Sequence, residues 1–224
     1  KHLNEMFGID YFRFWDELSF NHKKEANLLL DAIIESGLKV KMEFTVRVGL
    51  LNEDDIELAN KFKKAGTVQL NYALESGSQV ILEAMNKKIE PEWFVSQKKI
   101  LDRVGINSGT CIVLGYPQET KETLDQTFKF LAEAKSYPSA GFLLPAPGSE
   151  MYNYALERGY IRNEEEYVLA IGERQHMNLN FTSIPDDYFL HIVKEHLKRL
   201  RDVCEIDLDD DHLLATTVFE GKNT

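Results

Sequence analysis

Polar residues that can bind or transform a ligand gather directly after several apolar runs of this sequence. The clearest example is Glu75-Ser76-Gly77-Ser78, which follows an apolar run ending at Leu74 and precedes a helix-like pattern. A carboxylate at this junction can accept hydrogen bonds from the two vicinal hydroxyls of a ribose. Alternatively, Glu75 can cap the free amides of the following helix together with Ser76 or Ser78. The residue pattern leaves both roles open.

Further polar groups stand at the ends of the neighbouring apolar runs. Glu17, in the pair Asp16-Glu17, suits the first turn of a helix, where acidic residues are favoured. Arg47 fits a surface salt bridge as well as a ligand contact. Gly115 is either a turn residue or a point where a flat ring approaches the backbone. Each group is therefore a candidate ligand contact with an ordinary structural alternative.

Metal and nucleophile signatures are missing from the sequence. The six histidines show no HxH or HExxH spacing, which argues against a zinc site. GxSxG, Walker and GxGxxG motifs are also absent. Cys111 and Cys204 are the only cysteines and form no CxxC pair, so we expect both to be reduced.

A recurring order of helix, glycine and strand positions the polar groups. Hydrophobic periodicity predicts helices over 21–36, 52–65, 91–104, 120–135 and 186–203. Apolar segments predict strands over 9–17, 38–47, 67–74, 106–114 and 139–145. Asn21 and Asn52 are the expected N-caps of the first two helices, and Pro91 suits the first turn of the third.

Strands that alternate with helices of this length indicate parallel βα units. The expected fold is α/β, with about five mainly parallel strands and outer helices, as a partial barrel or an open doubly wound sheet. Ligands bind beyond the C-terminal ends of the strands in both architectures, which is where the polar groups fall. The acidic segment DLDDDHLL after the last helix is expected to be a solvated edge.

Composition limits the class of protein. The 224 residues are 43% hydrophobic, enough for a substantial core, and no run approaches the roughly 18 apolar residues of a membrane span. A net charge of -11 argues against nucleic acid as a partner. Without a secretory signal in the N-terminal residues, a cytoplasmic location is expected.

Five segments, taken in order, resemble the radical S-adenosylmethionine (SAM) enzymes, in particular the subgroup often fused to a cobalamin-binding domain. The segments are FGIDYFRFWDE, the Arg47 strand with LNEDDIELANKFKKAG, ALESGSQVILEAMNKKI, CIVLGYPQET and FLLPAPGSEMYNYALERGYI. The resemblance implies a partial (β/α) barrel of the TIM type in residues 1–160, lacking its first strand. Residues 161–224 would form a C-terminal helical extension.

The resemblance also implies roles for the residues at the strand ends. Glu75 and Ser76 would contact the SAM ribose, and Val113, Gly115 and Tyr116 would lie beside the adenine. Glu119 completes the pattern that the subgroup carries after Gly115.

Three further residues would lie near the other end of the cofactor by the same resemblance. Arg47 would reach the methionine part of SAM or the substrate. Asp16 and Glu17 would stand near the methionine amine or the substrate.

One departure from the family is plain. Its members bind a four-iron, four-sulfur cluster through a CxxxCxxC loop, and this sequence has no such loop. Cys111 and Cys204 cannot replace three close thiolates. We therefore expect the chain to be the C-terminal part of a longer protein and to be inactive alone. Upstream segments would bind the cluster and, in many subgroup members, cobalamin, and an external donor would supply electrons.

The intact enzyme would cleave SAM to a 5'-deoxyadenosyl radical for hydrogen abstraction from a small-molecule substrate or for methyl transfer. Two other functions stay open from the residues: a noncatalytic α/β docking module using the helix at 186–203, and a nonredox α/β barrel enzyme acting on a small phosphorylated substrate. A missing first strand would also leave a sheet edge and an apolar concave face exposed, which favours self-association.

Overall fold

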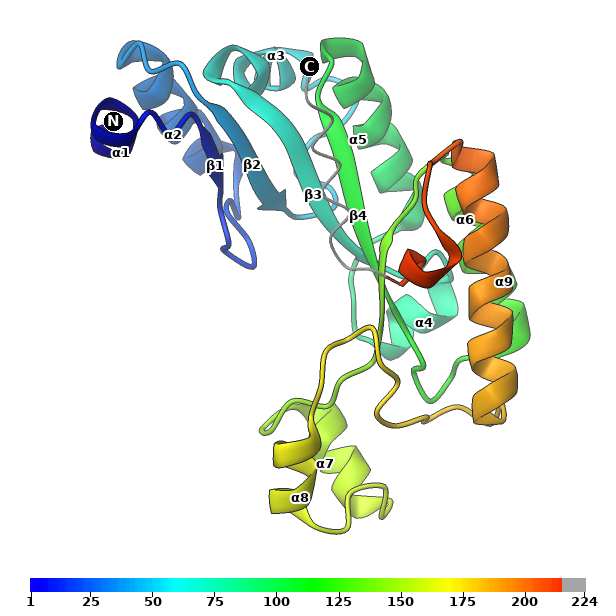
Figure 1. Ribbon diagram of the computed structural model, residues 1–224. Helices are drawn as coiled ribbons and strands as arrows, with labels where there is room; N and C mark the ends of the chain where they lie inside the picture. Colours follow the sequence, from blue (N-terminus) through cyan, green and yellow to red (C-terminus); the bar gives the residue numbers. More distant parts are fainter. Residues whose placement is uncertain (215–224) are drawn as a thin grey trace. The chain divides into compact units, whose positions relative to one another are not determined.

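The computed structural model describes residues 1–214 and divides them into two compact units (Figure 1). Unit 1 comprises residues 1–111 and 136–138, and unit 2 comprises residues 112–135 together with the chain from residue 139 onward. The predicted domain boundary at residue 160 stays a prediction.

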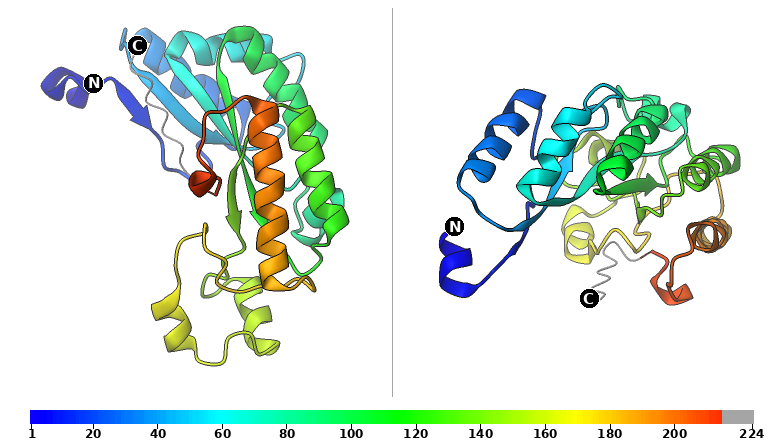
Figure 2. Two further views of the ribbon diagram at one scale, coloured as in Figure 1. Left: turned by 45° about the vertical axis from the view of Figure 1, so that its right-hand side comes forward. Right: turned by 90° about the horizontal axis from the view of Figure 1, so that it is seen from above.

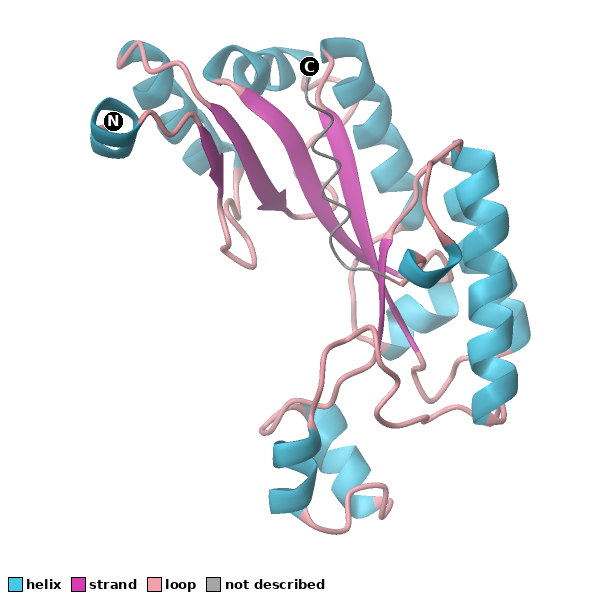
Figure 3. Cartoon of the chain, in the orientation of Figure 1, coloured by secondary structure: helices cyan, strands magenta, loops and turns pink. Residues whose placement is uncertain are grey.

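Five strands form one sheet in the order β1-β2-β3-β4-β5, as drawn in Figure 3. The strands are β1 (Tyr11–Arg13), β2 (Lys41–Val46), β3 (Thr67–Glu75), β4 (Asn107–Leu114) and β5 (Ser139–Phe142). β2 pairs in parallel with β1 on one side and with β3 on the other, with Arg13 opposite Glu43 and Phe44 opposite Leu70. The predicted α/β class with a mainly parallel sheet is confirmed.

Helices precede or follow each strand. They are α1 (His2–Phe7), α2 (Lys23–Glu35), α3 (Ile56–Ala65), α4 (Gln79–Ala84), α5 (Pro91–Val104), α6 (Lys121–Glu133), α7 (Glu150–Glu157), α8 (Glu164–Ala170), α9 (Asp186–Cys204) and the short 3₁₀ helix η1 (Asp210–His212). In unit 1, α2, α3 and α5 cover one face of the strands (Figure 2). Among the described residues, no helix is long and apolar enough to span a membrane.

Two predicted helix caps are wrong by one to three residues. His22, not Asn21, is the N-cap of α2, because the Glu25 carboxylate reaches back to accept from the amides of both residues. α3 begins after Asp55 instead of Asn52. The Asp55 carboxylate accepts from the Asn52 amide at 2.6 Å, which closes a turn before the helix starts.

The core of unit 1 lies between the sheet and these helices. Alternate residues of β2 and β3 point toward the helices and are buried: Met42, Phe44, Val46, Leu70, Tyr72 and Leu74. The Phe44 ring contacts Phe20 and, from α3, Phe62, with centroids 5.1 and 6.2 Å apart. Such buried aromatic groups each remove a large apolar surface from water and fix the helices on this face.

The opposite face of the unit 1 sheet is polar, so the expectation of an apolar concave face was wrong. Glu43, only 8% exposed, accepts from the Tyr11 hydroxyl and pairs with Arg13 at 3.4 Å. On β3, the Gln69 amide donates to Asn71 Oδ1 at 2.6 Å. Strand residues alternate between faces, and the helices take the apolar set. The polar set is therefore left for the other face.

Unit 2 holds α6 against α9. His196 of α9 stacks on Phe128 with ring centroids 4.7 Å apart, and its Nε2 lies 3.1 Å from an Asp125 oxygen. A second small core gathers Tyr152 and Ala155 of α7 with Ile161 and Phe181.

The acidic residues of the segment after α9 are exposed and two of the ion pairs of this region involve Asp210. Asp210 pairs with Arg201 at 2.7 Å and with Lys198 at 3.1 Å, and Leu213 is 1% exposed. The solvated-edge prediction therefore agrees with the exposure of the acidic residues and is wrong only for Leu213, which is buried. The rest of the tail, from residue 215 on, lies outside the described residues.

Gly66 offers a direct test of the packing of β2 and β3. Its φ is +101°, and a Cβ there would lie 2.0 Å from the Val40 carbonyl oxygen. Gly37 has a φ of +66° with nothing within 4 Å of an added Cβ. We expect Gly37→Ala to lower the free energy of unfolding by about 1 kcal/mol and Gly66→Ala to lower it by at least about 3 kcal/mol. Urea unfolding of both variants measures this, and equal losses would contradict the packing.

Candidate functional site at the C-terminal strand ends

The loop after β3 is compact and buried. Glu75 adopts a left-handed backbone conformation with φ of +69°, which is uncommon for a residue with a Cβ. Ser76 and Ser78 are 2% and 1% exposed, and the Ser78 amide donates to Ser76 Oγ at 3.1 Å. A strained residue followed by two buried hydroxyls is typical of a binding loop that the surrounding structure holds in place.

Glu75 does not cap the next helix. Its carboxylate instead accepts from Lys87 Nζ at 3.0 Å, and its side chain keeps 16% of its surface exposed. The N-cap of α4 is Ser78, whose side chain makes no capping hydrogen bond. Within residues 1–214, the contact seen for the Glu75 carboxylate is thus the one with Lys87 and not a helix cap. A carboxylate that is oriented by a lysine and still partly exposed to solvent can accept hydrogen bonds from the hydroxyl groups of a ligand.

The turn after β4 is closed by a buried carboxylate. Gly115, with φ of +94°, donates its amide to Glu119 Oε2 at 3.0 Å. Thr123 Oγ1 donates to Glu119 Oε1 at 3.0 Å. Burial raises the pKa of Glu119 to about 7, although both hydrogen bonds oppose the shift. Glu119 thus fixes the backbone of the turn that carries Gly115.

Val113 and Tyr116 flank this turn. Val113 is half-buried on β4, between the fully buried Ile112 and Leu114. Tyr116 is also half-buried, and burial together with the nearby Glu150 carboxylate raises the pKa of its hydroxyl. A partly exposed valine and tyrosine beside a glycine turn form an apolar surface that suits a flat ring.

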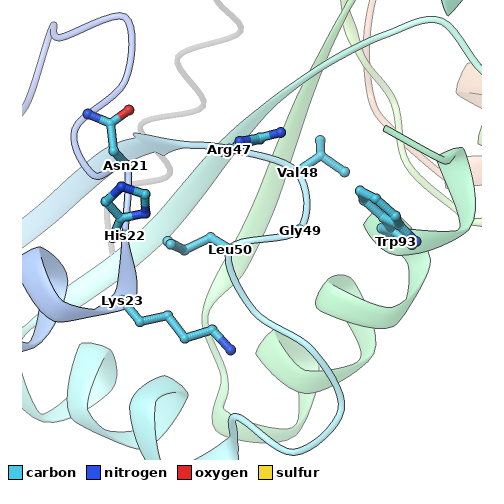
Figure 4. Close-up of a pocket in the computed structure, with 8 residues that line it drawn as sticks. All are labelled: Asn21, His22, Lys23, Arg47, Val48, Gly49, Leu50 and Trp93. Carbon is cyan, nitrogen blue, oxygen red and sulfur yellow. The ribbon is translucent and has the colours of Figure 1, made fainter. Parts of the chain in front are cut away.

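The remaining predicted site residues belong to unit 1 and are exposed. Asp16 and Glu17 follow β1, and neither has a hydrogen bond or ion pair within the part of the chain that the structure describes. Arg47 follows β2 and lines a pocket of about 290 Å³ together with Trp93 and the start of α2 (Figure 4).

Sequence reasoning missed Lys87, Trp93 and the first residues of α2 as parts of these sites. Lys87 lies twelve residues after Glu75, and no local spacing rule links the two. Of these residues, Trp93 is the one that the sequence could have indicated. It lies at the beginning of α5 with 40% of its surface exposed, and a large aromatic side chain that faces solvent is a candidate for ligand binding.

The described residues do not form a site for an iron–sulfur cluster. Cys111 and Cys204 form no disulfide within residues 1–214 and lie in different units. No group of three or more His, Cys, Asp or Glu side chains within residues 1–214 is placed to hold a metal ion. The reduced state of both cysteines stays a prediction.

Comparison with known proteins decides the family. The model of the radical SAM superfamily matches residues 8–131, more than half of the chain. The chain belongs to the radical SAM superfamily. An uncharacterized methyltransferase of Pyrococcus horikoshii, PH0819, is 28% identical over 155 residues, which are 69% of this chain and 33% of that protein. This radical SAM chain therefore spans about a third of the length of that relative.

Solved structures share the fold of this radical SAM chain. Coproporphyrinogen III oxidase (HemN) of Escherichia coli, a radical SAM enzyme, aligns with a TM-score of 0.60 at 14% identity, covering 87% of this chain and 40% of that one. The radical SAM methyltransferase TsrM of Kitasatospora setae, with cobalamin and a [4Fe-4S] cluster bound, aligns at 0.59 and 17%, covering 70% and 30%. The predicted partial barrel is confirmed.

The raised pKa of Glu119 predicts a pH dependence of stability. Below pH 4.5 the carboxyl is protonated in both folded and unfolded chains, and between pH 4.5 and about 7 only the folded chain retains the proton. The free energy of unfolding should therefore fall over this range, by on the order of 3 kcal/mol from this group. Glu119→Gln should remove that fall.

Urea unfolding at a series of pH values measures the effect. The exposed Glu133→Gln, at the end of the helix α6 that follows Glu119, is the matched control and should keep the wild-type pH dependence. Parallel curves for wild type and Glu119→Gln would show that Glu119 is ionised in the folded protein at pH 5.

Proposed function

We propose that this chain is the SAM-binding part of a radical SAM enzyme acting on a small molecule. The observation that carries the proposal is the family match over residues 8–131, which includes the ends of β3 and β4 where the two candidate loops lie. In the family's reaction, one electron cleaves SAM to methionine and a 5'-deoxyadenosyl radical. The radical then abstracts hydrogen from the substrate or takes part in methyl transfer.

By the family resemblance, the adenosine part of SAM would contact two loops of this chain. Glu75 would accept hydrogen bonds from the ribose hydroxyls, and Lys87 would fix the orientation of its carboxylate. The buried Ser76 would support the loop by accepting from the Ser78 amide. Val113, Gly115 and Tyr116 would contact the adenine, and Glu119 would hold their turn. Asp16 and Glu17 would approach the methionine amine or the substrate.

The cluster itself does not fit the described residues, so its ligands in the whole protein would come from other residues. An external donor would deliver the electron. This chain's contribution is to bind and orient SAM and to limit water around it, while the redox chemistry belongs to the cofactors.

Methyl transfer is the outcome that we favour. PH0819 is named a methyltransferase, and it shares sequence with this chain along 155 residues. Cobalamin as a second cofactor, a further segment that binds it, self-association and a cytoplasmic location all stay predictions.

Glu75→Ala tests the SAM contact. In the cluster-containing protein, loss of a charged acceptor should weaken SAM binding by about 1.5–3 kcal/mol. Isothermal titration calorimetry measures the affinity, with the exposed Glu57→Ala as the matched control. If Glu75→Ala binds SAM with the affinity of wild type, Glu75 has no role in the cofactor site.

A further inference from the structure

A pocket of about 290 Å³ lies at the end of β2, and neither Glu75 nor Gly115 is among its lining residues. In Figure 4 the segment from Arg47 to Leu50 runs between the start of α2 and Trp93. Its volume is at the lower limit of the roughly 300–1,000 Å³ that ligand sites usually enclose. The pocket therefore suits one end of a ligand and not a whole substrate.

Arg47 gives the pocket an uncompensated positive charge. Its guanidinium has no hydrogen bond or ion pair within residues 1–214, although the protein carries a net charge of -11. Lys23, the other cation of the lining, is already held by Asp55, with 2.6 Å between Nζ and Oδ2. Arg47 is therefore the residue of the pocket that is available to pair with an anion, and its planar fork matches phosphate and carboxylate oxygens.

The start of α2 adds to this preference. The helix runs for 13 residues from Lys23, and the first amides of a helix have no carbonyl partner within it. Glu25 accepts from the Asn21 and His22 amides that precede the helix. The Glu25 amide already donates to the His22 carbonyl at 3.1 Å, so within the described residues the Lys23 and Lys24 amides are the ones that favour negative charge at this wall.

Trp93 supplies an apolar wall. Its indole packs on the β2–α3 loop, where a Cβ at Gly49 would lie 3.1 Å from Trp93 Cε3, and 40% of the residue stays exposed. A tryptophan half-covered by backbone and half-open is fixed in position and can stack on an unsaturated ring. Arginine and indole thus line the same pocket.

We propose that this pocket binds a phosphate or carboxylate carried on a planar ring of the substrate, with Arg47 pairing the anion and Trp93 stacking on the ring. The inference rests on the proposed function and refines it, because it names the substrate class and assigns Arg47 to the substrate instead of the methionine part of SAM. The pocket holds the substrate by one end and leaves the rest of the molecule for the reaction.

Binding of phenyl phosphate to the 224-residue chain tests the proposal. The chain has two tryptophans, so the Trp15→Phe variant identifies the indole N–H signal of Trp93 in ¹H–¹⁵N spectra. Phenyl phosphate should shift this signal saturably, and inorganic phosphate should bind more weakly. Benzylamine, which carries the opposite charge, should leave the signal unchanged.

Arg47→Gln should weaken phenyl phosphate binding roughly tenfold or more, which corresponds to about 1.4 kcal/mol. Arg103→Gln is the matched control, because Arg103 is exposed in the last turn of α5, at the opposite end from Trp93. Arg47→Lys, which keeps the charge but not the fork, should give an intermediate affinity and serves if the glutamine variant does not fold.

Three results would overturn the proposal: a Trp93 signal that does not respond, equal affinities for Arg47→Gln and Arg103→Gln, or inorganic phosphate binding as tightly as phenyl phosphate. The last would identify a site for free phosphate. None of these titrations contains SAM. Negative results in these titrations would therefore not contradict the proposed SAM site. A negative SAM titration would likewise not contradict the proposal for this pocket.

Discussion

The alternation of side chains along parallel strands is the constraint on which the rest of this structure depends. A strand in a βα unit must bury one face against helices, and β2 and β3 do so with Phe44, Leu70, Tyr72 and Leu74. Every second residue is thereby excluded from that core. The polar residues of the other set, such as Glu43 and Asn71, face the opposite side of the sheet and do not disturb the packing of the helices.

The same constraint brings the loops that follow β2 and β3 to one edge of the sheet in unit 1. In parallel pairing, each strand ends at the same side of the sheet, so the residues that follow β2 and β3 share an edge in unit 1. Arg47 and its pocket follow β2, and the Glu75 loop follows β3. We propose that the loops after β3 and β4 bind the SAM adenosine and that the loop after β2 binds a substrate anion. The side chains that each loop carries are the reason for this assignment.

Local sequence signals were enough to predict the presence of the five strands and the starts of α5, α6 and α9. Pro91 begins α5 and Asp186 begins α9, as hydrophobic periodicity and capping preferences indicated. Contacts between distant residues were not predictable in this way. The pairing of Glu75 with Lys87, of Glu43 with Tyr11 and Arg13, and of Trp93 with the loop at Gly49 depends on how the elements pack. The apolar concave face was predicted wrongly for a related reason, since exposure was inferred from a missing neighbour instead of from the alternation along β2 and β3.

The most direct test of the account is an NMR titration of the ¹⁵N-labelled chain with SAM at high concentration. If the loops after β3 and β4 bind the adenosine part of the cofactor, the amide signals of Ser76 to Ser78 and of Gly115 and Tyr116 should shift together along one binding curve. Signals from α2, α3 and α5, which cover the other face of the unit 1 strands, should stay in place. Shifts confined to those helices, or none at saturating SAM, would contradict a SAM site at this edge.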